Sequence, residues 1–456
     1  MISTPSNTAS SQLTSVLKSG FNKQTRSAEP AVARDESKAA AMPPAPPEPQ
    51  TLAEAGLSEC DVEALVLKTL SQIGNSTGSE ISHEVCLSRS LLGETLSRLR
   101  DELLIAIKAS TGLNDYVYQL TEAGAARARQ HVARCNYVGA APVPLAVYTD
   151  AIRRQSIQNT RLKVEQLQSA LADLTLRTEL VQQIAQAIHD GRGLFLYGDP
   201  GNGKTTIAER ILNAFGQHLW IPRMIGIGGD MLRLFDATCH RPADAPQLAI
   251  TKYDRRWVLI ERPTVVVGGE LTLEQLDARF HPAVGISEAP VQMKANGGAL
   301  VIDDFGRQRV SSTEILNRLI VPLEKQFDYL NLASGRQIQA PFDLLFILST
   351  NLEPRQLVDE AFLRRIPYKI RVGDPTEQEF RGLLERIAKD KGFTIDAGAV
   401  EHLLDAHYRP LNRPLRFCHP RDLLRQVKNF CEVLERPSRV SKEAIDAAAT
   451  NYFSTL

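Results

Sequence analysis

The sequence predicts an α/β fold in which a parallel β-sheet carries helices on both faces, with one smaller domain before it and a helical region after it. Three apolar runs, at 194–197, 299–302 and 344–348, each end in polar or glycine-rich residues, as buried parallel strands do. A predicted helix precedes the first of these runs, and another follows its glycine-rich end.

The composition indicates a chain of two or three domains without a global charge signal. The chain has 456 residues, of which 43% are hydrophobic, and its 53 basic and 53 acidic residues cancel. A zero net charge excludes overall attraction to nucleic acid or to an acidic membrane, so any such binding has to be local.

Cysteine usage and the chain start indicate a cytoplasmic protein. Six cysteines occur without a C-x-x-C pair, which argues against a zinc ribbon, a redox motif or a disulfide framework. The first residues lack a basic start followed by an apolar core, and no run of about 18 apolar residues follows. We therefore expect no secretion and no membrane insertion.

The first 135 residues divide into an arm and a small domain. Residues 1–50 are rich in Ser, Ala and Pro and predict a disordered arm. Within 51–135, helical patterns at 61–74, 78–87 and 88–102 precede two β-like stretches, 103–108 and 116–120, and a last helix at 120–132. Three helices and a two-stranded wing, with the "YxLTxAG" ending, resemble a winged helix-turn-helix domain.

A linker and a connector helix are predicted over 136–174. The stretch 136–150 carries glycine and two prolines, which favour a domain boundary, and 151–174 has the pattern of a charged helix. A further helix at 175–191 ends at a glycine, where the strand GLFLY begins.

The segment LFLYGDPGNGKTTIAERIL, residues 194–212, matches the phosphate-loop pattern G-x-x-x-x-G-K-[ST] between a strand and a helix. Glycines let backbone N–H groups surround phosphates, and the helix directs its positive end at the anion. A plain glycine-rich turn is the alternative, but the strand-to-helix context favours a nucleoside triphosphate. The predicted nucleotide-binding residues are Gly198, Asp199, Pro200, Gly201, Asn202, Gly203, Lys204, Thr205 and Thr206.

Two adjacent carboxylates follow the next apolar strand, in GGALVIDDFGRQ. A carboxylate at the end of such a strand suits Mg²⁺, so we predict Thr205 and Asp303 as its protein ligands. Side chains of neighbouring strand residues point to opposite faces, but the chain turns away at a strand end, which lets Asp304 polarise a water.

Three further polar elements follow. Asn351 ends the strand of APFDLLFILSTNLEP and is predicted to orient an attacking water, although an Asn turn is the simpler alternative. Arg364 and Arg365 end a short helix, and a solvated face is the ordinary interpretation of such a pair. Arg421 lies in the first turn of a helix opened by Pro420, where a cation is unfavourable unless an anion faces it.

Taken in order, these elements resemble the AAA+ ATPases over about residues 175–456. The resemblance implies an ATPase core at 175–372 and a helical lid at 373–456, with ATP and Mg²⁺ as cofactors. It further implies Walker A at Lys204 and Thr205, Walker B at Asp303 and Asp304, sensor 1 at Asn351, an arginine finger at Arg365 with Arg364 as the alternative, and sensor 2 at Arg421. Most members have Glu at position 304, so slow hydrolysis is a further expectation.

Two features between the motifs point to a subgroup and to an insertion. Residues 328–351 have the pattern of a β-hairpin that turns at Ser334 and Gly335, similar to the clade that includes MoxR-type chaperones and magnesium chelatases. The stretch between the Walker motifs is long. It predicts an extra hairpin around Pro263 followed by a helix, and a mobile glycine loop at 224–230.

The resemblance implies a homo-oligomer, a hexameric ring with ATP at subunit interfaces, that remodels a protein client. One alternative is a DNA-binding ATPase whose third helix, residues 88–102, enters the major groove. That helix has mixed charge, since it carries Arg89, Arg98 and Arg100 together with Glu94, Asp101 and Glu102. A second alternative is a nucleotide switch that hardly hydrolyses ATP, because of Asp304.

Overall fold

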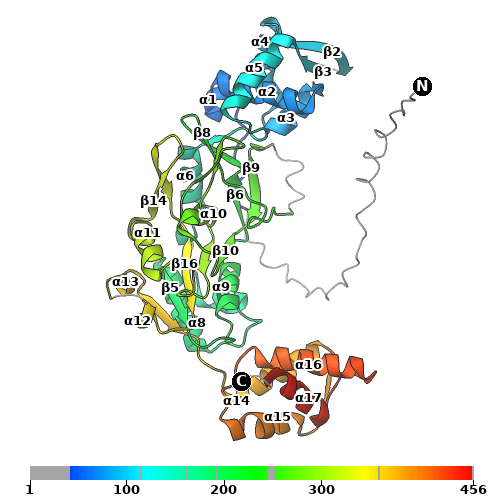
Figure 1. Cartoon of the computed structure of the whole chain (residues 1–456), viewed down its shortest axis with the longest axis vertical. Coiled ribbons are helices and arrows are strands. Elements are labelled where there is room, and N and C mark those ends of the chain that lie inside the picture. Colours follow the sequence, from blue (N-terminus) through cyan, green and yellow to red (C-terminus); the bar gives the residue numbers. More distant parts are fainter. Residues whose placement is uncertain are drawn as a thin grey trace, which may run out of the picture. The chain divides into compact units, whose positions relative to one another are not determined.

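The computed structural model describes residues 42–453, except 113–114, 160–161, 192, 245–251 and 358–359 (Figure 1). Most of the predicted arm, residues 1–41, therefore lies outside the described residues. None of the described helices combines the length and the apolar character needed to cross a membrane.

The first domain consists of helices and one antiparallel sheet of order β1-β3-β2. Side chains of Ser58, Thr77 and Ser88 cap three of its helices, because each accepts a hydrogen bond from a first-turn N–H. The predicted helices and the two β-stretches are all present. Its elements are α1 (Leu52–Ala55), α2 (Glu59–Ile73), β1 (Ser76–Thr77), α3 (Gly78–Val85), α4 (Arg89–Asp101), β2 (Ile105–Gly112), β3 (Asp115–Leu120) and α5 (Glu122–Arg134).

The end of the predicted arm and the predicted linker both pack against the rest of the protein. In residues 42–50, the carbonyl of Pro43 accepts from Trp220 Nε1 at 3.2 Å and that of Pro46 accepts from the N–H of Asp254 at 2.9 Å, so the end of the predicted arm is held by backbone hydrogen bonds. The predicted linker and connector helix at 136–174 is broken into β4 (Val143–Pro144), α6 (Leu145–Arg154) and α7 (Val164–Ala170). Tyr148 and Ile152 on α6 are fully buried, which makes this segment part of the core.

The central sheet is parallel throughout, with strand order β10-β13-β16-β5-β17. Its strands are short and apolar, as expected for strands covered on both faces. They are β5 (Leu194–Tyr197), β10 (Thr264–Val267), β13 (Ala299–Ile302), β16 (Leu345–Thr350) and β17 (Tyr368–Arg371).

Helices cover both faces of this sheet, as predicted. Leu194 and Leu196 point to a cluster with α7, α8 (Thr178–Asp190) and α9 (Lys204–Ile211), whereas Phe195 between them points to the opposite cluster. That second cluster holds residues of α11 (Ser312–Lys325) and α13 (Glu360–Arg365), which pack on the sheet's other face. Two shorter helices are α10 (Val291–Lys294) and α12 (Pro354–Leu357).

The insertion between β5 and β13 differs from the prediction. No hairpin forms around Pro263: β9 (Trp257–Glu261) pairs with β6 (His218–Pro222), while β10 joins the central sheet beside β13. The predicted helix is one short 3₁₀ segment, Leu273–Leu276. Residues 224–230, predicted as a mobile loop, form an antiparallel hairpin instead: β7 (Met224–Ile227) pairs with β8 (Asp230–Arg233) across a turn at Gly228 and Gly229. This hairpin belongs to a sheet of order β11-β12-β8-β7-β4, which includes β11 (Arg279–His281) and β12 (Ile286–Glu288).

The predicted hairpin before the third motif strand is confirmed. Strands β14 (Phe327–Asn331) and β15 (Gln337–Pro341) pair antiparallel and are followed directly by β16. Their turn contains Gly335 at a φ of 79°, a conformation that glycine adopts without strain.

The C-terminal region forms its own helical cluster, and Figure 1 shows its helices packed together. Its core contains Phe380, Leu403, Leu424 and Ala448, one from each helix. The elements are α14 (Glu377–Asp390), β18 (Thr394–Ile395), α15 (Ala399–His407), α16 (His419–Val433), β19 (Arg439–Val440) and α17 (Lys442–Phe453).

Candidate functional site

The glycine-rich loop lies between β5 and α9, where the sequence places it. Gly198 has a φ of 139°, and a Cβ there would lie 2.3 Å from the carbonyl oxygen of Val372. Gly201 has a φ of 84°, and its Cβ would lie 2.5 Å from Cys418 Sγ. The loop therefore needs glycine at these two positions both for its backbone conformation and for its close neighbours.

The Lys204 side chain is almost fully buried at the start of α9 and points back into the loop. Its Nζ donates to the carbonyl oxygens of Gly198 at 2.8 Å and Asp199 at 3.0 Å, and to Asn351 Oδ1 at 2.7 Å. Burial lowers the pKa of Lys204 from its ordinary value, and the nearby carboxylates of Asp303 and Asp304 act against that shift.

The two predicted magnesium ligands are adjacent in the structure. Thr205 Oγ1 donates a hydrogen bond of 2.9 Å to Asp303 Oδ2. Asp303 directly follows β13, and its N–H donates to Val267 O at 2.8 Å, which fixes the strand end. The hydroxyl and the carboxylate thus present two oxygen atoms side by side, the ligand type that Mg²⁺ prefers.

Asp304 reaches the same place because the backbone reverses there. Its φ is 47°, in the left-handed region, and its Oδ1 accepts from Asn351 Nδ2 at 2.9 Å. Asp and Asn adopt this conformation more readily than most other residues. The structure therefore brings Asp303, Asp304 and Asn351 together with Lys204, as the sequence predicted.

These residues fit a nucleotide triphosphate with its magnesium ion. The N–H groups of Gly203, Lys204 and Thr205 donate no hydrogen bond to any residue that the structure describes, so they are available to phosphate oxygens. Lys204 supplies a positive charge beside them, and Thr205 with Asp303 would supply two oxygen ligands to a magnesium ion.

An arginine that the sequence analysis missed connects the C-terminal region to the loop. Arg416 Nη1 contacts Asp199 Oδ2 at 2.8 Å and also pairs with Asp374, and only 15% of its side chain is exposed. The N–H of Cys418 donates to Gly201 O at 2.9 Å, while Asn202 Nδ2 donates to Asp374 Oδ1 at 2.7 Å. The available signal was the sequence RPLRF directly before α16.

Arg421, predicted to face a phosphate, does not lie at the loop. Its side chain is 68% exposed, and its Nε donates a 3.2 Å hydrogen bond to Asp422 Oδ1 on the same helix turn. Arg416 lies where Arg421 was expected, because the segment before α16 contacts the loop whereas the first turn of α16 does not.

Arg364 and Arg365 end α13, as predicted. Arg364 is exposed, while Arg365 Nε donates to Glu324 Oε1 on α11 at 2.6 Å and its guanidinium carbon lies 5.9 Å from the Phe362 ring centroid. The two neighbours therefore differ: Arg365 is positioned by contacts and Arg364 extends into solvent.

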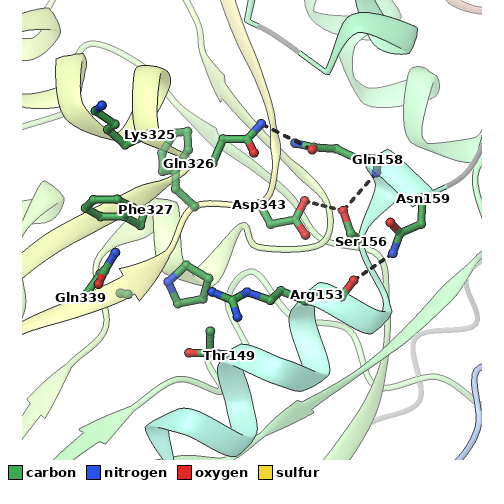
Figure 2. Close-up of a pocket in the computed structure, with 13 residues that line it drawn as sticks. Thr149, Arg153, Ser156, Gln158, Asn159, Lys325, Gln326, Phe327, Gln339 and Asp343 are labelled. Atoms are coloured by element: carbon green, nitrogen blue, oxygen red, sulfur yellow. Dashed lines mark hydrogen bonds between the residues drawn. The ribbon is translucent and has the colours of Figure 1, made fainter.

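A pocket of about 440 Å³ lies apart from these residues, between α6 and the β14–β15 hairpin (Figure 2). Arg153 and Lys325 line it, and Asp343 accepts a hydrogen bond of 2.8 Å from Ser156 Oγ. Burial raises the pKa of Asp343, against the hydrogen bond from Ser156. The sequence analysis singled out none of these residues.

The strand order places β5, with its glycine-rich loop, between β16 and β17, and shows the predicted α/β fold with a parallel sheet. Residues 376–451, the C-terminal helices, match a family described as a domain of unknown function (DUF8689). No curated protein sequence matches the chain.

Two solved structures are similar at a distance. NtrX from Brucella abortus is 16% identical, with a TM-score of 0.39, over 63% of this chain and 58% of its own, so this chain spans less than two thirds of NtrX. A point mutant of RuvB from Thermotoga maritima is 13% identical, with a TM-score of 0.37, over 62% of this chain and 71% of its own. Likenesses this distant carry no inference about activity.

Proposed function

We propose that this protein binds ATP with Mg²⁺ and hydrolyses it, and that it acts as an oligomeric remodeller of a protein client. The proposal rests on three hydrogen bonds. Asn351 bonds to both Lys204 and Asp304, and beside them Thr205 bonds to Asp303. A cation, two metal-ligand oxygens, a carboxylate and an amide meet beside a glycine loop, which is the combination that phosphoryl transfer to water requires.

Each side chain then has a separate task. Lys204 binds the β- and γ-phosphates and neutralises their charge, while Thr205 and Asp303 hold Mg²⁺, which supplies further neutralisation of the phosphates. Asp304 accepts a proton from the attacking water, and Asn351 fixes the direction of the Asp304 carboxylate through its amide N–H.

The C-terminal helices are proposed as a lid that responds to nucleotide. Arg416 contacts Asp199 within the loop and Asp374 at the start of the lid. Its guanidinium therefore lies where it could exchange these carboxylates for a phosphate bound in the loop. Movement of Arg416 between these carboxylates and a phosphate would change how the lid is held.

The proposed ring, a hexamer, rests on the arginines at the end of α13. An arginine that acts on the nucleotide of a neighbouring subunit typically raises the rate by about 10³ to 10⁵. Arg365 is held by Glu324 and is therefore the better positioned of the two candidates for that contact.

The N-terminal domain is proposed, as a winged-helix domain, to recruit the client. It is attached to the insertion by two arginines: Arg255 donates to Ser82 Oγ at 2.7 Å, and Arg256 donates to the carbonyl of Ala55 at 2.7 Å. These charge-assisted bonds, of which the one from Arg256 is buried, support an insertion that mounts this domain on the ATPase core.

Internal ion pairs favour a protein client over DNA. On α4, Arg98 pairs with Glu63 and Glu102 at 3.1 Å, and Arg100 pairs with Asp101 at 2.9 Å. Arg89 contacts Asp115 at 3.4 Å. Because phosphate neutralisation supplies most non-specific DNA affinity, arginines already paired with carboxylates contribute less to it.

The test is steady-state ATP hydrolysis over a range of protein concentrations, with the mass of the assembly recorded at each point. Turnover per subunit that rises steeply as oligomers form would support the proposal. Turnover that is independent of concentration would contradict the shared site, and tight binding without turnover in assembled protein would favour a nucleotide switch.

A further inference from the structure

Two histidines of the C-terminal region converge on one carboxylate oxygen. His402 Nε2 and His407 Nε2 each lie 2.7 Å from Asp446 Oδ1. Both histidines come from α15 and the aspartate comes from α17, two helices that pack against each other in the C-terminal core. The three ligand atoms lie within 4.8 Å of one another.

We propose that His402, His407 and Asp446 bind one divalent transition-metal ion of the Zn²⁺ type. Imidazole nitrogen with carboxylate oxygen is a donor set that selects zinc, cobalt or nickel over magnesium and calcium, which prefer oxygen alone. This site is separate from the proposed nucleotide site, whose magnesium ligands are a hydroxyl and a carboxylate.

The geometry needs little adjustment to hold such an ion. With Zn–N and Zn–O bonds of about 2.0 to 2.1 Å, two ligand atoms of a tetrahedral ion lie about 3.3 Å apart. The present separations of 2.7 Å from each imidazole to the carboxylate thus have to widen by about 0.6 Å, while the two imidazole nitrogens, which lie within 4.8 Å of each other, have to reach the same spacing. Surface side-chain rotamers accommodate a change of that size.

The site has room for one or more further ligands. The exposed side-chain fractions are 26% for His402, 22% for His407 and 49% for Asp446. Three protein ligands at a partly open position leave the fourth coordination place of zinc to water or to a donor from another molecule. Within this chain, the ion would join α15 to α17.

Other histidine and cysteine pairs do not reproduce this convergence. Among the residues that the structure describes, no other group of three or more His, Cys, Asp or Glu residues brings its ligand atoms so close. His240, for example, is nearly fully buried, and its ring nitrogens bond to the backbone of Asp236 and Lys294. The Cys239–His240 and Cys418–His419 pairs are outside this cluster.

The experiment is a Co²⁺ titration of the full-length, chelator-treated protein followed by visible absorption, in excess Mg²⁺ to occupy Thr205 and Asp303. We expect one ion per chain and a spectrum of nitrogen and oxygen ligation without a thiolate charge-transfer band. Zn²⁺ should displace the Co²⁺. Absence of Co²⁺ binding, or a thiolate band from the free cysteines, would overturn the proposal. Both outcomes can be observed with the unmodified protein.

Variants then locate the ion. His402→Gln, His407→Gln and Asp446→Asn should each weaken Co²⁺ binding by at least about 100-fold, since even a residue that only supports a ligand is worth 10- to 100-fold. His189→Gln on α8 and His281→Gln beside Glu288 are matched controls that should bind as the unmodified protein does. Equal binding by all variants would contradict the assignment, and circular dichroism checks that each one folds.

Discussion

Lys204 and Asn351 are joined by a 2.7 Å hydrogen bond, although 147 positions separate them in the chain. The Asn351 amide uses both of its ends, since its oxygen accepts from the lysine and its nitrogen donates to Asp304 at 2.9 Å. The contact sets the orientation of the amide, so the phosphate-binding cation and the proposed base are coupled through one side chain.

Replacing Lys204 tests the nucleotide site itself. Lys204→Ala should weaken ATP binding about 10- to 100-fold, because a hydrogen bond to a charged group contributes about 1.5 to 3 kcal/mol. Fluorescent-nucleotide titration measures the change. Lys428→Ala, an exposed lysine paired with Glu432, is the control and should bind normally. Unchanged binding in Lys204→Ala would exclude the proposed role.

Replacing Asp304 separates binding from chemistry. Asp304→Asn keeps a residue that tolerates the left-handed backbone and keeps a partner for Asn351, but it removes the base. Turnover should fall by about 10² to 10⁴ while ATP affinity stays close to normal. Parallel measurement of kcat and nucleotide Kd checks this, and a variant with undiminished kcat would assign the base elsewhere.

The two lid arginines should behave differently. Arg416→Ala removes contacts with Asp199 and Asp374, and we expect a loss of at least about tenfold in turnover. Arg421→Ala removes an exposed side chain and should change turnover less than about twofold. Steady-state assays of both variants decide the matter. If Arg421→Ala were the more damaging change, the lid would have to occupy another position during turnover.

Mixed oligomers test the arginine at the subunit interface. Arg365→Ala alone should lose about 10³ or more in turnover but bind ATP normally. Mixing it with Lys204→Ala subunits should restore part of the activity, because one variant supplies the nucleotide site and the other the arginine. Arg364→Ala is the matched control. Absence of recovery in co-assembled protein would contradict a shared site.

The N-terminal domain should lose stability in acid through Glu63. This carboxylate has a 5% exposed side chain. Burial raises its pKa, but hydrogen bonds from Arg127 and Arg98 outweigh burial and the net pKa is lowered. A lowered folded pKa means that the stabilisation is complete above about pH 4.5 and disappears as pH falls through the folded value.

The measurement is thermal unfolding of the wild type and Glu63→Gln across pH. The variant should be about 2 kcal/mol less stable near neutral pH, and the difference should shrink in acid. Glu59→Gln, with a 73% exposed side chain, should differ little at any pH. A pH-independent gap for Glu63→Gln would show a packing effect and not a charge effect.

The sequence predicted the parts of the site that follow directly from strand and loop patterns. Lys204, Asp303 and Asn351 each come at the end or start of a regular element, so their spacing along the chain determines where they meet. Asp304 was also placed at the site, because a strand end permits a turn, although the left-handed φ became visible only in the structure.

Features that depend on tertiary contacts were predicted less well. Arg416 lies in an irregular segment, and no periodicity indicates that its backbone neighbour Cys418 bonds to Gly201. The β-like runs around Pro263 were correctly taken as strands, but pattern alone does not reveal that β9 and β10 belong to different sheets. Proline in 42–50 likewise indicated disorder, whereas backbone carbonyls there pair with Trp220 and Asp254.

The left-handed backbone at position 304 also restricts which acids can evolve there. A one-base change converts an aspartate codon to glutamate, and the longer acid is the common residue in the AAA+ families that this chain resembles. Glutamate adopts such a backbone less readily than aspartate, although Glu435 does so in this chain at a φ of 53°, and the exchange carries a cost of about 1 kcal/mol. The exchange to glutamate would therefore lower the stability of this turn by about 1 kcal/mol, so the conformation at position 304 favours the shorter acid independently of its chemistry.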